Sequence, residues 1–210
     1  MTLDDALRQA RDLVATLEAM KDAPADEVTS PAGPASGKTL AWGARVSATF
    51  RDRLFWLCDD LGMAPDDLMT CIAWESGRSF RPDVRNMAGS GATGLIQFMP
   101  STARDLGTTT DDLARMTAED QLNYVWKYFA PYKGRLRSLG DIYMAILWPS
   151  AVGKPDSHVL WSQAQRPTTY RQNAGLDGNR DGRITKAEAV AKVAALKPEG
   201  LNPGNVWSER

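Results

Sequence analysis

Residues 72–104 read IAWESGRSFRPDVRNMAGSGATGLIQFMPSTAR, and the rest of the chain is organised around this stretch. It begins in an apolar helix that ends at Glu75, passes through a short basic loop and a glycine-rich segment, and enters a new helix. A carboxyl group at a helix end, beside tryptophan and phenylalanine, lies in surroundings of low polarity. Such surroundings raise the pKa of the carboxyl group, so that it holds its proton near neutral pH. We therefore expect Glu75 to act as a general acid of the kind that cleaves glycosidic bonds.

Two motifs in this stretch carry a family resemblance. WESG at 74–77 and GATGLIQFMPSTA at 91–103 follow each other in the order and at the separation found in the soluble lytic transglycosylase catalytic domain, which is related to goose-type lysozyme. The resemblance covers roughly residues 45 to 165, the extent of one domain. It implies an all-α, lysozyme-like fold in which Glu75 is the sole catalytic acid/base.

The same resemblance implies the residues that line the saccharide cleft. The family's Gly-Leu-Met-Gln element corresponds to Gly94, Leu95, Ile96 and Gln97, with isoleucine in place of the usual methionine. Ser76, directly after the glutamate, joins them as an expected substrate-binding residue.

A third family motif, Ala-Tyr-Asn, places a tyrosine opposite the catalytic glutamate, and this chain departs from it. Residues 144–148 read MAILW, with Tyr143 just ahead of them. Tyr143 either supplies the hydroxyl from a shifted position or is an ordinary core aromatic. The segment 142–155 and the C-terminal tail instead resemble muralytic proteins encoded by bacteriophages, which implies a phage setting.

Capping residues and helical periodicity divide the chain into four parts. Residues 1–22 predict an amphipathic helix, and residues 23–39, rich in Pro, Ala, Gly and Ser, predict a flexible linker. Residues 40–165 are expected to form the catalytic domain, and residues 166–210 a calcium-binding tail. The N-terminal helix is expected to dock on the body or on another protein. No convincing strand pattern occurs, so the sequence predicts helices throughout.

Composition excludes several classes of function. The formal net charge is −1, which gives no reason to expect a nucleic-acid partner. The apolar runs are too short to span a bilayer, and the start of the chain lacks a basic signal-peptide region. Cys58 and Cys71 each fall inside a predicted helix; a disulfide between them is possible, but buried free thiols are the expected state.

The tail contains a second motif, DGNRDGRITKAE at 177–188, which fits the twelve-residue EF-hand loop. The expected oxygen ligands are the side chains of Asp177, Asn179, Asp181, Thr185 and Glu188 together with the backbone carbonyl of Arg183. Such ligands favour a hard cation, Ca²⁺ first and Mg²⁺ second. Thr185 and Glu188 also form a capping box, so an ordinary polar turn before a helix is the alternative. Because the loop is single, a structural clamp is expected rather than a calcium sensor.

The leading hypothesis is therefore an enzyme that cleaves the β-1,4 bond between N-acetylmuramic acid and N-acetylglucosamine in peptidoglycan glycan strands, as an endolysin or a virion-associated lysin. Whether it is a transglycosylase or a hydrolase stays open. Its location also stays open: either the host cytoplasm before release to the cell wall, or the phage virion. A non-catalytic glycan-binding or tail structural module is the alternative. Asp83 and Asp105 belong to no matched motif and receive no role, and His158 is expected to be a surface or packing residue. Arg78, Arg81 and Arg85 either meet a substrate carboxylate or are solvated loop charges.

Overall fold

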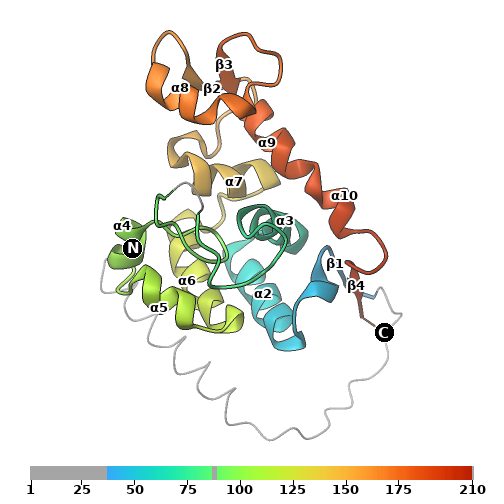
Figure 1. Cartoon of the computed structure of the whole chain (residues 1–210). Helices are drawn as coiled ribbons and strands as arrows, with labels where there is room; N and C mark the ends of the chain where they lie inside the picture. Colours follow the sequence, from blue (N-terminus) through green and yellow to red (C-terminus); the bar gives the residue numbers. More distant parts are fainter. Residues whose placement is uncertain (1–36, 87–88, 210) are drawn as a thin grey trace, which may run out of the picture. The chain divides into compact units, whose positions relative to one another are not determined.

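Helix α3, Pro65–Glu75, is the central helix of the structure, a computed structural model that describes residues 37–86 and 89–209 (Figure 1). Every residue from Asp67 to Ala73 is buried. A helix that is buried on all sides needs neighbours all round it. Those neighbours are α2 (Ala48–Leu61), α7 (Leu139–Leu147), α9 (Lys186–Ala194) and α10 (Leu196–Gly200). The end of α3 therefore lies in the body of the protein.

Local capping chemistry sets the helix boundaries. The Ser47 hydroxyl accepts the Phe50 N–H at the start of α2, and Gly62, with φ of 70°, ends that helix in the left-handed conformation. Pro65 occupies the first turn of α3, where its missing N–H has no cost. Thr117 caps α6 (Ala118–Phe129), and Ser138 caps α7 in the same way. The sequence predicts the helix starts at Pro65, Thr117 and Ser138 and the helix end at Gly62, and the structure confirms them, whereas the Ser47 cap was not predicted.

The remaining elements are short. They are η1 (Gly43–Arg45), α4 (Pro100–Asp105), α5 (Thr110–Arg115), η2 (Ala130–Tyr132), η3 (Pro149–Ala151), α8 (Pro167–Asn173), η4 (Ala174–Leu176) and the strands β1 (Thr39–Leu40), β2 (Val159–Ser162), β3 (Arg183–Thr185) and β4 (Trp207–Ser208). The strands form two antiparallel pairs, β1 with β4 and β2 with β3. The prediction of helices throughout was wrong at these four places, although the fold class is mostly α as predicted.

The C-terminal tail is part of the same compact unit as the helices before it, residues 37–210. Strand β4 pairs with β1, and α10 packs against α3. The Lys186 Nζ donates to Asp141 Oδ1 at 2.7 Å in a buried ion pair between α9 and α7. Gly200 lies against the Trp42 ring, where a Cβ atom would come within 2.4 Å. The tail is thus held to the body along its length, while α8, β2 and β3 project at one end (Figure 1).

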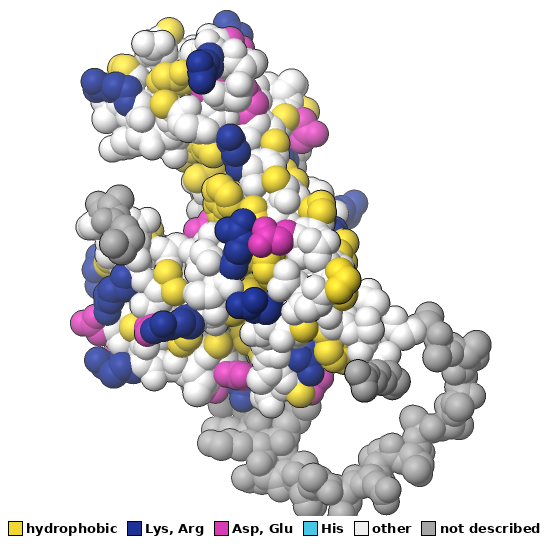
Figure 2. All heavy atoms as spheres, turned by 45° about the vertical axis from the view of Figure 1, so that its right-hand side comes forward, with side chains coloured by type: hydrophobic (Ala, Val, Ile, Leu, Met, Phe, Trp, Pro, Cys, Tyr) yellow, Lys and Arg dark blue, Asp and Glu magenta, His cyan; other side chains and the backbone are white. Residues whose placement is uncertain are grey.

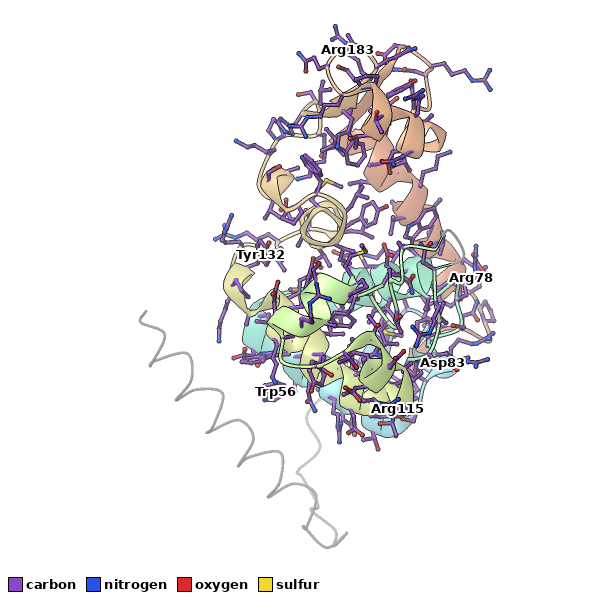
Figure 3. All side chains as sticks on the ribbon, turned by 60° about the vertical axis from the view of Figure 1, so that its left-hand side comes forward. Trp56, Arg78, Asp83, Arg115, Tyr132 and Arg183 are labelled. Atoms are coloured by element: carbon purple, nitrogen blue, oxygen red, sulfur yellow. The ribbon has the colours of Figure 1, made fainter. Side chains whose placement is uncertain are left out.

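The described unit extends from the helices around α2 to the projecting end of the tail. Trp56 on α2 lies toward one end and Arg183 on β3 toward the other (Figure 3). Cys58 and Cys71 are buried free thiols, as predicted. None of the described helices is long and apolar enough to cross a membrane. The predicted N-terminal helix at 1–22 and the linker up to residue 36 lie outside the described residues.

Candidate active site

Glu75 is the last residue of α3, and the chain turns sharply after it. The Ser76 N–H and the Ser76 hydroxyl both donate to the Ile72 carbonyl, at 2.9 and 2.7 Å, and the same hydroxyl accepts the Phe80 N–H at 3.1 Å. Gly77 and Arg78 then take positive φ angles of 59° and 66°. The buried Ser76 hydroxyl is therefore engaged with the backbone. These hydrogen bonds fix the turn that follows Glu75 at the end of α3.

The Glu75 carboxyl group is held away from water and from other charges. Burial raises its pKa from 4.5 to about 7. Among the residues that the structure describes, none forms a hydrogen bond or an ion pair with this carboxyl group. The side chain as a whole is only half-buried, so part of it faces open space. An unpaired carboxyl group that stays protonated near neutral pH has the properties of a general acid.

Two tyrosines lie within electrostatic reach of Glu75. Burial raises the pKa of Tyr128 to about 12, with Tyr132 and then Glu75 adding to the shift. Burial also raises the pKa of Tyr143, and the charge of Glu75 raises it further, while a side-chain hydrogen bond with Trp74 acts in the opposite direction. Both phenols thus stay protonated. Tyr143 is 3% exposed and belongs to the core, so its role as the shifted tyrosine stays a prediction, and Tyr128 was not predicted.

The Tyr128 side chain is positioned by α7 and by aromatic neighbours. Its hydroxyl donates to the Ala145 carbonyl at 2.6 Å, and its ring meets the Phe98 and Phe129 rings edge-on, at centroid distances of 6.0 and 5.1 Å. The sequence did not single out Tyr128, because it belongs to no matched motif. In the structure it is half-buried on α6, next to Phe129.

The glycine-rich motif folds into a tight loop with its polar groups turned inward. Thr93 and Phe98 exchange both backbone hydrogen bonds, at 3.0 and 2.9 Å. Gly94 has a φ of 88°, and the Gln97 amide donates to the carbonyls of Val84 and Gly94, each at 3.1 Å. Leu95 and Ile96 are buried, whereas Gln97 is half-buried. These residues therefore shape the loop beside Phe98, and among Gly94, Leu95, Ile96 and Gln97 only Gln97 is partly open to solvent.

Gln121 on α6 holds this loop in place, and the sequence did not reveal it. It is fully buried; its Oε1 accepts the Leu95 N–H at 2.7 Å, and its Nε2 donates to the carbonyls of Pro82 and Leu113, at 3.1 and 2.9 Å. A Cβ atom on Gly94 would lie 2.3 Å from the Gln121 amide oxygen. Glycine at this position is thus required both by its φ angle and by the approach of Gln121.

A pocket of ≈ 470 Å³ borders Glu75 through its neighbours Trp74 and Tyr143. Leu147 of α7 completes that side, and residues of the tail, including Gln172, Leu176 and Lys192, form the other. Figure 2 shows apolar side chains gathered at the waist of the surface, below the projecting end of the tail, which is at the top. The pocket combines aromatic and aliphatic surface with a polar rim, which suits a saccharide ligand.

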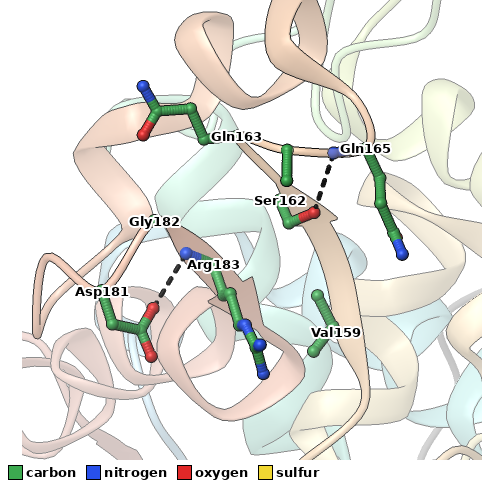
Figure 4. A pocket seen from close by; sticks show the side chains of 8 residues that line it. Val159, Ser162, Gln163, Gln165, Asp181, Gly182 and Arg183 are labelled. Carbon is green, nitrogen blue, oxygen red and sulfur yellow. Dashed lines mark hydrogen bonds between the residues drawn. The ribbon is translucent and has the colours of Figure 1, made fainter.

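A larger pocket, of ≈ 640 Å³, lies in the projecting end, where β2 and β3 meet (Figure 4). Its lining includes Ser162, Gln163, Asp181 and Arg183. The Gln165 N–H donates to the Ser162 hydroxyl at 3.2 Å, and the Arg183 N–H donates to Asp181 Oδ1 at 2.8 Å. Glu75 itself lines neither of these two pockets; its chain neighbour Trp74 and Tyr143 line the smaller one, which is therefore the one next to Glu75.

The predicted EF-hand loop is closed by its own hydrogen bonds. Asp177 Oδ1 accepts the Arg180 N–H at 2.7 Å, while its Oδ2 accepts the Gly182 N–H at 3.0 Å and the Tyr170 hydroxyl at 2.6 Å. Glu188 Oε1 accepts the N–H groups of Gly178 and Asn179. The Thr185–Glu188 capping box is present, as predicted. Across the described residues, no group of three or more His, Cys, Asp or Glu side chains is arranged to hold a metal ion.

The loop arginines each have a carboxylate partner. Arg78 pairs with Glu199, Arg81 with Asp83, and Arg85 with Asp111. These pairs are solvent-exposed, so the structure favours the reading of the arginines as solvated surface charges. Asp83 is therefore engaged with Arg81, and Asp105 is exposed at the end of α4. His158 is half-buried, with its backbone N–H bonded to Pro155 and its carbonyl to Lys186.

Comparison with known proteins finds a family likeness for the part of the chain that contains Glu75. Residues 59–145 match the family model described as the Transglycosylase SLT domain. The match covers Glu75, the glycine-rich loop, Gln121 and Tyr128, and it ends within α7, before the tail begins. A search of curated proteins found no match to the chain. That family comprises lytic transglycosylases that act on peptidoglycan, and residues 59–145 of this chain are similar to its SLT domain.

Proposed function

We propose that this protein is a lytic transglycosylase that cleaves the β-1,4 bond between N-acetylmuramic acid and N-acetylglucosamine in peptidoglycan. The observation that carries the proposal is the Glu75 carboxyl group, with a pKa raised to about 7 and without a hydrogen-bond partner in the described chain. Its chain neighbour Trp74 and Tyr143 line a pocket of ≈ 470 Å³. The SLT match supplies the reaction class and the substrate class.

In the proposed reaction, Glu75 acts twice. Its carboxyl group first gives a proton to the glycosidic oxygen, and the bond from that oxygen to C1 of muramic acid breaks. The resulting carboxylate then takes the proton of the C6 hydroxyl of the same sugar, and the C6 oxygen bonds to C1. The products are a 1,6-anhydromuramic end and a free N-acetylglucosamine hydroxyl, and Glu75 has regained its proton. One carboxyl group is enough because no water molecule has to be activated.

Two tyrosines near Glu75 have separate parts in the proposed site. Tyr143 lines the pocket, and its hydroxyl stays protonated, so it can donate a hydrogen bond to substrate or to the Glu75 carboxylate formed after the first step. The Tyr128 hydroxyl donates to the Ala145 carbonyl, and its ring packs edge-on against Phe98. Tyr143 thereby takes the part that the family assigns to the tyrosine of its third motif, and Gln97 shapes the adjoining loop.

Mass analysis of the products from purified peptidoglycan tests this function. We expect anhydromuramic ends from the wild-type protein and none from Glu75→Gln, with Asp105→Asn as a control that changes an exposed carboxylate near the motif. Reducing ends from the wild type would assign a hydrolase and so contradict the transglycosylase step. Absence of any product from a folded sample that still sediments with cell walls would assign a non-catalytic glycan-binding module.

We also propose a phage origin and a cell-wall site of action, either as an endolysin released from the host cytoplasm or as a virion-associated lysin. The resemblance of residues 142–155 and of the tail to phage muralytic proteins supports this setting. These residues include the end of α7 and the segment leading to β2, both of which pack into the body rather than forming a separate cell-wall-binding module.

A structural Ca²⁺ in the 177–188 loop is a further part of the proposal. The donor chemistry fits a hard cation, and Gly182, with φ of 80°, makes the turn that the sixth loop position requires. Arg183, Ile184 and Thr185, at loop positions 7 to 9, form β3, which pairs with β2. Asp177, Asn179, Asp181, Thr185 and Glu188 with the Arg183 carbonyl would hold the ion, which would replace the N–H groups that now face the carboxylates.

A further inference from the structure

One wall of the pocket beside Glu75 comes from outside the SLT match. Trp74, Tyr143 and Leu147 belong to α3 and α7, whereas Gln172, Leu176 and Lys192 belong to α8, η4 and α9 of the tail. These tail segments pack against β2 and the rest of the tail, and α9 packs on α3 and α7. Because the SLT match ends at residue 145, this wall lies outside the matched residues.

Lys192 supplies the positive charge on this wall. Its neighbours in the tail are engaged: the Nζ atoms of Lys186 and Lys197 pair with Asp141 and Asp67, each at 2.7 Å. Lys192 is exposed, and within the described part of the chain no carboxylate pairs with its Nζ. A lysine that lines a pocket without a carboxylate partner leaves its charge for an anionic ligand.

The other groups of the pocket define what accompanies that anion. Trp74, Leu147 and Leu176 are half-buried and contribute apolar surface, and Gln172 adds an amide at the rim. A fitting ligand therefore has an apolar part and a negative charge, and it adjoins the bond at Glu75. In peptidoglycan, the lactyl group of muramic acid and its peptide have this combination. The ether-linked carbon of the lactyl group bears a methyl group, and it is followed by a chain that carries carboxylates.

We propose that Lys192 is a specificity-determining residue that binds a carboxylate on the muramic acid substituent, and that the tail wall thereby selects muramic acid at the cleavage site. This inference rests on the proposed function. It predicts that the tail contributes to substrate affinity while Glu75 carries the chemistry. The anion is either a carboxylate of the peptide or, on peptide-free strands, the lactyl carboxylate itself.

The test compares Lys192→Ala, Lys192→Arg and the control Lys127→Ala, an exposed helix lysine whose Nζ lies over the Tyr124 ring. The substrates are soluble glycan strands with native peptides, the same strands with amidated carboxylates, and peptide-free strands. On native strands we expect Lys192→Ala to raise KM about two- to fivefold with kcat unchanged, the range typical of an exposed ion pair. Lys192→Arg should restore the wild-type KM, and Lys127→Ala should match the wild type.

On amidated strands the wild type and Lys192→Ala should have the same KM, because the anion is gone. A difference that persists on peptide-free strands would assign the lactyl carboxylate, and its loss there would assign the peptide. Equal KM values on native strands, or an equal loss on amidated strands, would overturn the proposal. If the wild type cleaves no substrate, the proposed function fails, and sedimentation binding of native and amidated strands by wild type and Lys192→Ala then decides the role of Lys192 by itself.

Discussion

At Glu75 the requirements of stability and of the proposed catalysis conflict. A carboxyl group in surroundings that raise its pKa from 4.5 to about 7 costs free energy whenever it ionises. The folded state binds more protons than the unfolded state between these two pH values. Stability is therefore greatest below pH 4.5 as far as this group is concerned, and it falls as the pH rises through about 7. The same shift supplies the proton that a general acid needs.

Glu75→Gln should separate these two effects. The amide cannot donate the proton, so cleavage should fall by at least the 10²- to 10⁴-fold typical of general acid catalysis. At pH 8 the variant should be more stable than the wild type, by at most ~3 kcal/mol from the linked pKa shift, and near pH 4.5 the two should be alike. Urea unfolding at both pH values measures the stability, and the wild-type pH–rate profile should fall above about pH 7.

Asp105→Asn is the matched control for this experiment, because it neutralises an exposed carboxylate close in sequence to the SLT loop. It should change neither the pH dependence of stability nor the rate. Near wild-type cleavage by Glu75→Gln would show that another group is the acid. A variant that is no more stable at pH 8 than the wild type would show that the Glu75 carboxylate is not penalised by burial.

At the scale of elements, the fold depends on how α6 holds the loop that follows α3. Gln121 joins Leu95, Pro82 and Leu113 through one amide group, and all three partners are backbone groups, two from the segment between α3 and α4 and one from α5. Each buried polar group left without a partner costs about 1–3 kcal/mol. The geometry of the family motif thus depends on a side chain on a different helix.

Gln121→Ala should destabilise the protein by about 2 kcal/mol or more, because it leaves the buried Leu95 N–H and the Pro82 carbonyl without their partner, whereas the Leu113 carbonyl keeps the Met116 N–H. The Leu95 amide should lose protection against hydrogen exchange, and cleavage should fall with it. Denaturant unfolding and exchange rates measure these effects. Asn123→Ala, a half-buried position on the same helix, is the control and should cost under about 1 kcal/mol. A Gln121→Ala variant with wild-type stability would mean that the loop holds its shape without this amide.

Elements whose boundaries rest on local chemistry could be predicted from the sequence. Pro65, Thr117 and Ser138 begin their helices by capping or by a fixed φ angle, and Glu75 falls at the end of α3 as expected. The short strands could not be predicted, because β1 pairs with β4 across most of the chain and neither has an alternating pattern. Gln121 and the tail wall of the pocket could not be predicted either, because their partners are distant in sequence.

At the scale of the whole molecule, the 177–188 loop joins two segments that reach the catalytic pocket. Leu176 precedes the loop, Lys192 lies on the helix after it, and both line the pocket with Trp74. The loop itself lies in the projecting end with β2 and β3 (Figure 1). An ion that fixed the loop would fix the angle between these two segments without touching Glu75. Its effect should therefore appear in stability and not in the chemical step.

Ca²⁺ should raise the melting temperature, and a chelator should lower it. Binding to the folded state alone adds about 2.7 kcal/mol at a hundredfold excess over Kd. Asp177→Ala combined with Glu188→Ala should abolish the difference, because these two carboxylates now occupy the loop's own N–H donors and would pass to the ion. Asp52→Ala combined with Asp105→Ala removes two exposed carboxylates outside the loop and should keep the response. Melting curves with Ca²⁺, with Mg²⁺ and with chelator measure the effect.

At a temperature where every form is folded, kcat should stay the same with and without the ion. Loss of kcat on chelation would mean that the ion controls the cleft. A melting curve indifferent to Ca²⁺ would mean that the loop is a capped turn.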